Sequence, residues 1–132
     1  MIIIFYEKPG CTNNSLQKLL LQSCGHEVKA FSLLAEAWTA DTLKPYFSGI
    51  PVAEWFNQAA PRIKSGEVNP DDYNENEAIQ ALLADHLLIR RPLMIVDNTC
   101  ICGFDNETVQ SLIQHQDTSH LQSCHKLSDP CL

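Results

Sequence analysis

The first 25 residues constrain the fold most, because they join an apolar run to a helical pattern through a turn that carries a cysteine. Residues 2–6 are β-branched and aromatic and end before a Pro-Gly pair, which is typical of a strand buried on both faces. Leu16, Leu19 and Leu20 then recur at helical spacing, and a glycine follows the expected helix end. Cys11 is therefore predicted to lie where a central strand turns into a helix N-terminus.

This position has chemical consequences for Cys11. A thiol at a helix start meets free backbone N–H groups and the positive end of the helix dipole, which favour the thiolate and its nucleophilicity. A small, half-buried packing residue is the alternative interpretation, since free cysteines are usually buried. Its place in a turn favours the reactive interpretation.

Length and charge limit the class of protein. The 132 residues are enough for one domain with a core and too few for two ordinary domains. The net charge of −7 argues against nucleic acid as a partner, because phosphate binding needs a basic face. No apolar run approaches the ~20 residues of a membrane span. No basic leader precedes the first apolar run, so we expect a cytoplasmic protein whose six cysteines are reduced thiols.

The rest of the chain alternates between strand and helix patterns. Residues 26–31 predict a short, half-buried strand that runs parallel to the first one, because a whole helix separates the two. Residues 57–73 are rich in Asn, Pro, Gly and Asp and predict an exposed connection. Residues 93–103 predict a hairpin with a two-residue turn, and Asp105 is expected to cap a last helix.

Helical signals occupy the middle of the chain. Thr39 is placed to cap a short helix, and Asn74 with Glu77 forms a capping-box pattern. We therefore predict an α/β fold in which a helical insertion, about residues 39–86, separates the second and third of four strands. The helices are expected on both faces of a mixed sheet, within a domain of residues 1–115.

Residues 116–132 show no periodicity and predict a flexible C-terminal tail. Histidines and cysteines in this region suggest a metal site as the other interpretation. Their spacing fits no standard zinc finger, so no metal site is predicted.

Three stretches together resemble a known family. The strand–Pro–Gly–Cys–helix start and residues 88–94, Leu-Ile-Arg-Arg-Pro-Leu-Met, are similar to the thioredoxin-fold arsenate reductases. Residues 51–57 and 60–66 are similar to the branch of that family called nitrogenase-associated proteins. The resemblance covers about residues 1–115. It implies a thioredoxin-like domain, with the helical insertion laid over the edge of the active site.

The resemblance also implies a set of site residues. Pro92 falls where thioredoxin folds carry a cis proline opposite the nucleophile, and Arg91 falls beside the thiol. A guanidinium there would lower the pKa of Cys11 and bind an oxyanion through two hydrogen bonds. Arg62 falls near an arginine that holds the oxyanion, although Lys64 is a neighbouring substitute. Arg90 is equally compatible with a solvated surface charge.

The start of the expected helix supplies hydrogen-bond donors. Asn13, Asn14 and Ser15 could hold an anion or a glutathione carboxylate, and plain helix capping explains them equally well.

The chain departs from the family pattern at several points. Arsenate reductases have a further arginine after the last hairpin, where residues 103–106 offer none. Their loop has a histidine four residues before the cysteine, where Glu7 stands here, and an acid near the thiol would raise its pKa. Relatives with a Cys-x-x-Cys pair have a second cysteine where Asn14 stands. A monothiol mechanism without a bound cofactor or metal follows if the protein is an enzyme.

The other cysteines are poor partners for Cys11. Cys24 would lie roughly 20 Å away along the helix, whereas a disulfide needs Cα atoms within about 7 Å. Cys100 and Cys102 are expected on an edge strand roughly 10 Å from the first strand. Tail cysteines or an external thiol such as glutathione, delivered alone or through glutaredoxin, would therefore resolve a Cys11 adduct.

Two functions remain open at this level. The first is an arsenate-reductase-like monothiol oxidoreductase associated with nitrogen fixation, with Cys11 as nucleophile. The second is a non-catalytic interaction or assembly factor that binds nitrogenase-related proteins through the same fold. Cys11, Arg91 and Pro92 favour the first function, and the missing arginine and second cysteine favour the second.

Overall fold

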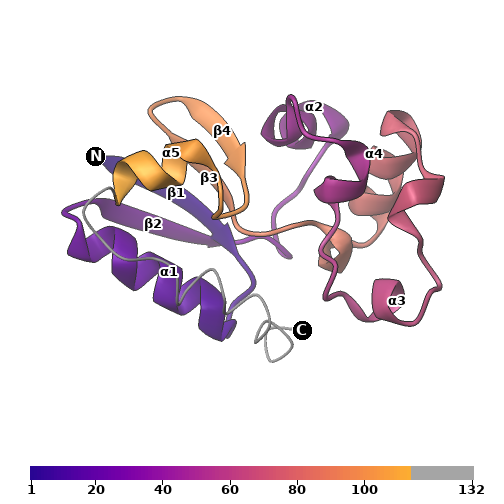
Figure 1. The fold of residues 1–132 in the computed structure, drawn as a ribbon, viewed down its shortest axis with the longest axis horizontal. Helices are drawn as coiled ribbons and strands as arrows, with labels where there is room; N and C mark the ends of the chain where they lie inside the picture. The colour runs from indigo at the N-terminus through magenta and orange to yellow at the C-terminus, as the bar shows by residue number, and fades with distance from the viewer. Residues whose placement is uncertain (114–132) are drawn as a thin grey trace.

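The computed structural model describes residues 1–113, which contain a four-stranded mixed sheet of order β2-β1-β3-β4 (Figure 1). Strand β1 (Ile2–Glu7) pairs in parallel with β2 (Glu27–Ser32) and antiparallel with β3 (Leu93–Val96). Strand β4 (Thr99–Cys102) pairs antiparallel with β3 at the edge. The predicted α/β architecture, with its parallel first pair and its C-terminal hairpin, is confirmed.

Two buried clusters occupy opposite faces of the sheet. On one face, Ile3, Phe5 and Met94 pack with residues of α1 (Thr12–Ser23) and α5 (Glu107–Leu112). On the other face, Leu93 packs with the buried residues of the segment between β2 and β3. Successive strand residues point to opposite faces, so neighbours in β3 serve different clusters. Helical segments therefore cover both faces, as the sequence predicted.

Helix α1 presents a different face to the protein than its leucines predict. Leu19 is 60% exposed, while Asn14 and Gln17 are buried together with Leu21. Of the three leucines at helical spacing, Leu20 therefore packs against the apolar cluster, whereas Leu16 and Leu19 are exposed. Asn14 is fixed by a hydrogen bond from the backbone N–H of Lys8 to its Oδ1 atom, 3.2 Å, and this contact sets the rotation of the helix.

The insertion between β2 and β3 is built from short helices gathered beside the sheet (Figure 1). The predicted helix cap at Thr39 and the predicted capping box at Asn74 are both present, and Thr39 also forms a capping box, with Thr42. The prediction of an exposed connection over residues 57–73 is confirmed for most of its residues, but Ala60, Val68 and Pro70 are buried and two short helices form within it. The helices in chain order are α2 (Ala40–Leu43), η1 (Lys44–Phe47), η2 (Val52–Trp55), α3 (Pro61–Lys64), η3 (Pro70–Asp72), α4 (Glu75–Ala84) and η4 (His86–Leu88), where η denotes a 3-10 helix.

The hairpin and the last helix are joined as predicted, apart from one cap. Asp97 and Asn98 form the two-residue turn with φ values of 50° and 64°, which such hairpin turns require. Helix α5 begins at Asn106, whose side chain accepts a hydrogen bond from the backbone N–H of Val109. The prediction that Asp105 caps this helix is wrong, because its carboxylate pairs with Arg90 instead. Within the described chain, every helix is too short or too polar to cross a bilayer.

Candidate active site

A cavity of about 400 Å³ opens where the start of α1 meets the insertion and the loop after β4. Segments that are far apart in the chain build it, and Cys11 and Arg91 both face it. Its lining comprises Cys11, Asn13, Asn14, Gln17, Glu54, Phe56, Asn57, Gln58, Ala59, Arg90, Arg91, Gly103, Phe104 and Asp105.

Cys11 is the N-cap residue of α1. Its backbone N–H donates to the carbonyl of Lys8 at 3.1 Å, and its own carbonyl accepts from the N–H of Ser15 at 3.0 Å. The residue is 2% exposed but lines the cavity, and neither of the two apolar clusters described above includes it. The thiol is therefore recessed at the helix start, where the dipole favours a negative charge.

Two cations, Arg91 and Lys8, lie beside or within the loop that precedes Cys11. Arg91 lines the cavity directly before the cis peptide bond to Pro92, and burial lowers the pKa of its guanidinium. Burial also lowers the pKa of Lys8, and the positive charge of Arg91 lowers it further. Since the guanidinium of arginine does not lose its proton in proteins, Arg91 stays charged at neutral pH despite this shift. The loop before Cys11 therefore lies in a positive field.

Asn14 organises this loop from inside the helix. Its Oδ1 atom accepts from the N–H of Lys8, and its Nδ2 atom donates to Oε1 of Gln17 at 3.0 Å. Asn13 also lines the cavity, whereas Ser15 is exposed and lies outside the lining. Of the donors predicted at the helix start, Asn13 and Asn14 are thus brought to Cys11.

Glu7 does not act as an isolated acid beside the thiol. Its carboxylate forms an ion pair with the ammonium group of Lys18 at 2.8 Å, and both side chains are largely buried. Lys18 lies on α1, so the pair joins the end of β1 to the helix that follows. The negative charge of Glu7 is therefore offset locally, which reduces the effect expected from its position in the sequence.

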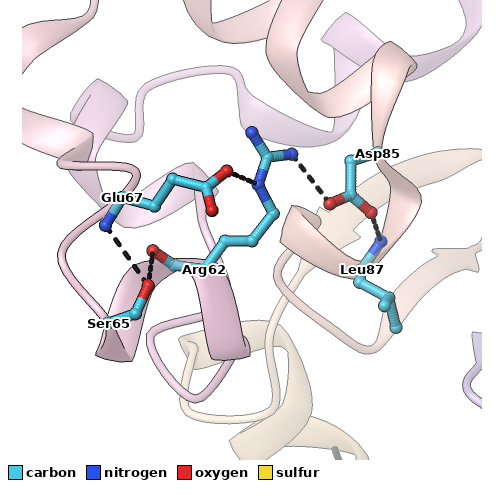
Figure 2. Close-up of polar contacts among 5 residues, drawn as sticks. All are labelled: Arg62, Ser65, Glu67, Asp85 and Leu87. Carbon is cyan, nitrogen blue, oxygen red and sulfur yellow. Dashed lines mark hydrogen bonds and ion pairs between the residues drawn. The ribbon is translucent and has the colours of Figure 1, made fainter.

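Arg62 lies away from the cavity. Figure 2 shows its guanidinium between two carboxylates, with Nε bonded to Glu67 at 2.6 Å and an Nη atom bonded to Asp85 at 3.0 Å. These two contacts raise the pKa of Arg62. The arginine thereby ties α3 to the end of α4, and it is absent from the described residues that line the cavity. The neighbouring Lys64 is not among the lining residues either.

Several lining residues carried no signal in the sequence. Gln17 sits inside a helix pattern whose leucines predicted another face, and Asp105 has the spacing of a helix cap. Glu54, Asn57 and Gln58 belong to the insertion. No local sequence pattern predicts that the insertion lies beside the start of α1. Only the tertiary fold brings these side chains to Cys11.

The remaining described cysteines lie far from Cys11 in the architecture. Cys24 is the C-cap of α1, at the opposite end of a 12-residue helix, roughly 20 Å away at the helical rise. Cys100 and Cys102 lie on β4, with β3 between that strand and β1. All three are free thiols. The tail cysteines, Cys124 and Cys131, and the histidines suggested as an alternative metal site lie outside the described residues.

Cys102 is buried, and this burial raises the pKa of its thiol to about 12. In residues 1–113, no group of three or more His, Cys, Asp or Glu side chains is arranged to hold a metal ion.

Comparison with known proteins gives consistent matches. The sequence pattern of the ArsC family matches residues 6–112. A Rhodospirillum rubrum protein, described as a 15.7 kDa protein in the draG 3′ region, is 49% identical over 124 residues, or 92% of this chain and 87% of that protein.

Solved structures share the fold at low identity. An ArsC-family-related protein of Bacteroides fragilis superposes with a TM-score of 0.72 at 24% identity, over 85% of this chain and 98% of that chain. An arsenate reductase of Vibrio cholerae has a TM-score of 0.69 at 17% identity, again over 85% of this chain and 98% of that chain.

Proposed function

The chain belongs to the ArsC family, and on that premise we propose that it is a monothiol oxidoreductase in which Cys11 is the nucleophile and Arg91 its electrostatic partner. One observation carries this proposal. Cys11 caps a helix N-terminus and lines the same cavity as the Arg91 guanidinium. A helix start and a nearby cation both stabilise a thiolate, which is the reactive form of cysteine.

The proposed reaction uses one protein thiol. The Cys11 thiolate attacks the oxidised substrate and forms a covalent adduct, while Arg91 stabilises negative charge at the reacting centre. An external thiol, which we take to be glutathione alone or working with glutaredoxin, then attacks the adduct and regenerates the thiolate. The distance from Cys11 to the free cysteines of α1 and β4 argues against those cysteines as resolving thiols, so the tail cysteines remain the alternative to an external thiol. A cytoplasmic location is part of this proposal, because reduced thiols persist there.

An association with nitrogen fixation is also part of the proposal. The similarity of residues 51–57 and 60–66 to nitrogenase-associated proteins supports it. The name of the Rhodospirillum rubrum relative, which places that protein in the draG 3′ region, describes its gene neighbourhood and adds no chemistry. Nitrogenase-related proteins are accordingly proposed partners, whether as substrates or as binding partners.

A second function is supported by the pairing of the arginines. Arg62 is bound by Glu67 and Asp85, and Arg90 is bound by Asp105. Arg62 is thereby held away from the cavity, and Arg90 lines it with its charge paired to a carboxylate. Such a cavity is a weaker oxyanion site than the family pattern implies. This favours, as the alternative, a non-catalytic assembly factor that retains the fold.

Turnover assays separate the two functions. The native protein is supplied with glutathione, glutaredoxin and either arsenate or a small disulfide, and thiol consumption is followed. We expect substrate-dependent consumption with the native protein, its loss in Cys11→Ser, and its retention in the control Cys24→Ser. If the native protein and Cys11→Ser are equally inert with both substrates, the enzyme proposal is wrong and the assembly factor stands.

A further inference from the structure

The charges that line the Cys11 cavity cancel. Its described lining contains two arginines, Arg90 and Arg91, and two acids, Glu54 and Asp105. A multiply charged tetrahedral anion binds best where cations exceed acids and can form paired hydrogen bonds with its oxygens. Among these side chains, the arginines do not outnumber the acids.

Asp105 is responsible for much of this balance. Its carboxylate accepts a hydrogen bond from an Nη atom of Arg90 at 2.8 Å. The other Nη atom of Arg90 donates to the backbone carbonyl of Glu54 at 3.3 Å. A Cβ added to Gly103 would lie 2.9 Å from the guanidinium, so Arg90 rests against the backbone of the loop after β4. Arg90 is thus held on the cavity wall with its charge offset.

Neutral amide side chains supply the remaining polar lining. They come from the start of α1 and from the insertion, and Nδ2 of Asn57 is buried without a hydrogen-bond partner. Carboxamides both donate and accept hydrogen bonds, which matches the groups of a peptide main chain better than an acceptor-only anion. These side chains are Asn13, Asn14, Gln17, Asn57 and Gln58.

We propose that Asp105 is a specificity-determining residue, which pairs with Arg90 and thereby selects a disulfide carried by a peptide over a multiply charged oxyanion. The inference rests on the proposed function, because it assumes that Cys11 reacts with a substrate in this cavity. Asp105 itself does not touch the reacting atoms. It acts through the charge of Arg90.

The reaction that this substrate would undergo is thiol–disulfide exchange. The Cys11 thiolate attacks one sulfur of the substrate disulfide, a new S–S bond forms to Cys11, and the second substrate sulfur leaves as a thiolate. An external thiolate such as glutathione then attacks the mixed disulfide at the substrate sulfur. Cys11 leaves as a thiolate, and the substrate remains as a mixed disulfide with the external thiol, so no further oxidant or reductant is needed.

Two alkylating probes of different charge test the role of Asp105. Rates of Cys11 modification by anionic iodoacetate and by neutral iodoacetamide are measured on the full chain after its disulfides have been reduced and the reductant removed, with the Cys11-containing peptide quantified by mass spectrometry. Both reagents need the same thiolate, so the ratio of the two rates reports the charge of the cavity and not the amount of thiolate.

The variants are Asp105→Asn, the double variant Asp105→Asn/Arg90→Gln, and Glu107→Gln as a matched control. Glu107 is an exposed acid in the first turn of α5 and lies outside the lining. At low ionic strength we expect Asp105→Asn to raise the iodoacetate-to-iodoacetamide ratio about fivefold, because one cation is released beside the thiol. The double variant and Glu107→Gln should return the wild-type ratio.

The outcomes distinguish this inference from the proposed function. If Cys11 of the native protein reacts readily with iodoacetamide but Asp105→Asn leaves the ratio unchanged, the inference is wrong and the proposed function stands. An equal rise in Glu107→Gln, or a rise that persists in the double variant, also overturns it. If native Cys11 reacts with neither reagent, the proposed function fails and the inference fails with it.

Discussion

The expected reactivity of Cys11 depends on charged residues, and only some of them are its neighbours in the sequence. Lys8 lies on the same loop, but Arg91 comes from the approach to β3, and the carboxylate of Glu7 is offset by Lys18 on α1. Sequence reasoning found the thiol and, through the family resemblance, Arg91. It could not find the Glu7–Lys18 pair, because no local rule pairs a strand end with the second turn of the next helix.

The Glu7–Lys18 pair can be tested by removing its cation. In Lys18→Met, the charge of Glu7 is no longer offset, and a negative charge near a thiol disfavours the thiolate. We expect the iodoacetamide alkylation rate of Cys11 at pH 7 to fall about threefold. Lys29→Met removes an exposed cation from β2 and should leave the rate unchanged. An equal fall in both variants would show that the effect is general and not local to the pair.

Gly103 should tolerate a side chain less well than a glycine of similar backbone conformation. Gly103 and Gly25 have φ values of 85° and 90°, so alanine is strained at both. A Cβ at Gly103 would also displace the Arg90 guanidinium, whereas nothing lies within 4 Å of one at Gly25. We expect Gly103→Ala to lower the free energy of unfolding by about 1 kcal/mol more than Gly25→Ala. Equal losses in denaturant titrations would contradict the contact.

At the scale of elements, sequence patterns correctly predicted the features that depend on residues close to one another in the chain. Three such features are present: the cap at Thr39, the capping box at Asn74 and the turn at Asp97-Asn98. Each of them depends on residues only a few positions apart. The short helices within residues 57–73 were missed, because isolated helices of a single turn are unstable and form only through packing. The inward face of α1 was missed because the spacing of the leucines does not reveal that Asn14 is buried and bonded to the loop before Cys11.

The Asn74 cap provides a test of these local forces. The Asn74 side chain accepts from the backbone N–H of Glu77 at 2.8 Å. Asn74→Ala should therefore lower the free energy of unfolding by about 1 kcal/mol. Asn76→Ala, in the first turn of the same helix, should be neutral or slightly stabilising because alanine favours helix. Chemical denaturation of both variants checks this, and equal effects would mean that the cap contributes nothing.

At the scale of the whole molecule, the fold could be predicted and the cavity could not. The parallel first pair of strands and the hairpin follow from patterns within the chain, and the helical insertion follows from the family resemblance. The cavity needs the insertion to lie beside the start of α1, and that depends on packing among residues such as Phe56 and Leu88, which are distant in sequence. Arg62 is an example. Its position in the sequence suggested that it belongs to the site, but its ion pairs with Glu67 and Asp85 hold it away from the cavity.

Global stability should fall at alkaline pH, and Cys102 should account for part of the fall. Its pKa is raised from 9.0 to about 12, so the native state keeps its proton where the unfolded chain loses it. The stabilisation is fully present below pH 9 and is lost as pH rises through about 12. One such group gives a slope of at most about 1.4 kcal/mol per pH unit.

Replacing the thiol tests this assignment. Cys102→Ala should lower stability overall but flatten the dependence of the unfolding free energy on pH above 9. Cys24→Ala removes a partly exposed thiol and should keep the native slope. The slope is measured below about pH 10, because the pKa of Tyr6 is also raised, to about 12, and adds to the fall at higher pH. An unchanged slope in Cys102→Ala would contradict the assignment.

The rate of Cys11 alkylation by iodoacetamide, followed against pH, tests most directly whether the helix start and Arg91 hold an activated thiolate. We predict a midpoint well below the free-thiol value of about 8.5, and an upward displacement of about one pH unit in Arg91→Gln. A midpoint at or above about 8.5 in the native protein, or one that Arg91→Gln leaves unmoved, would contradict it.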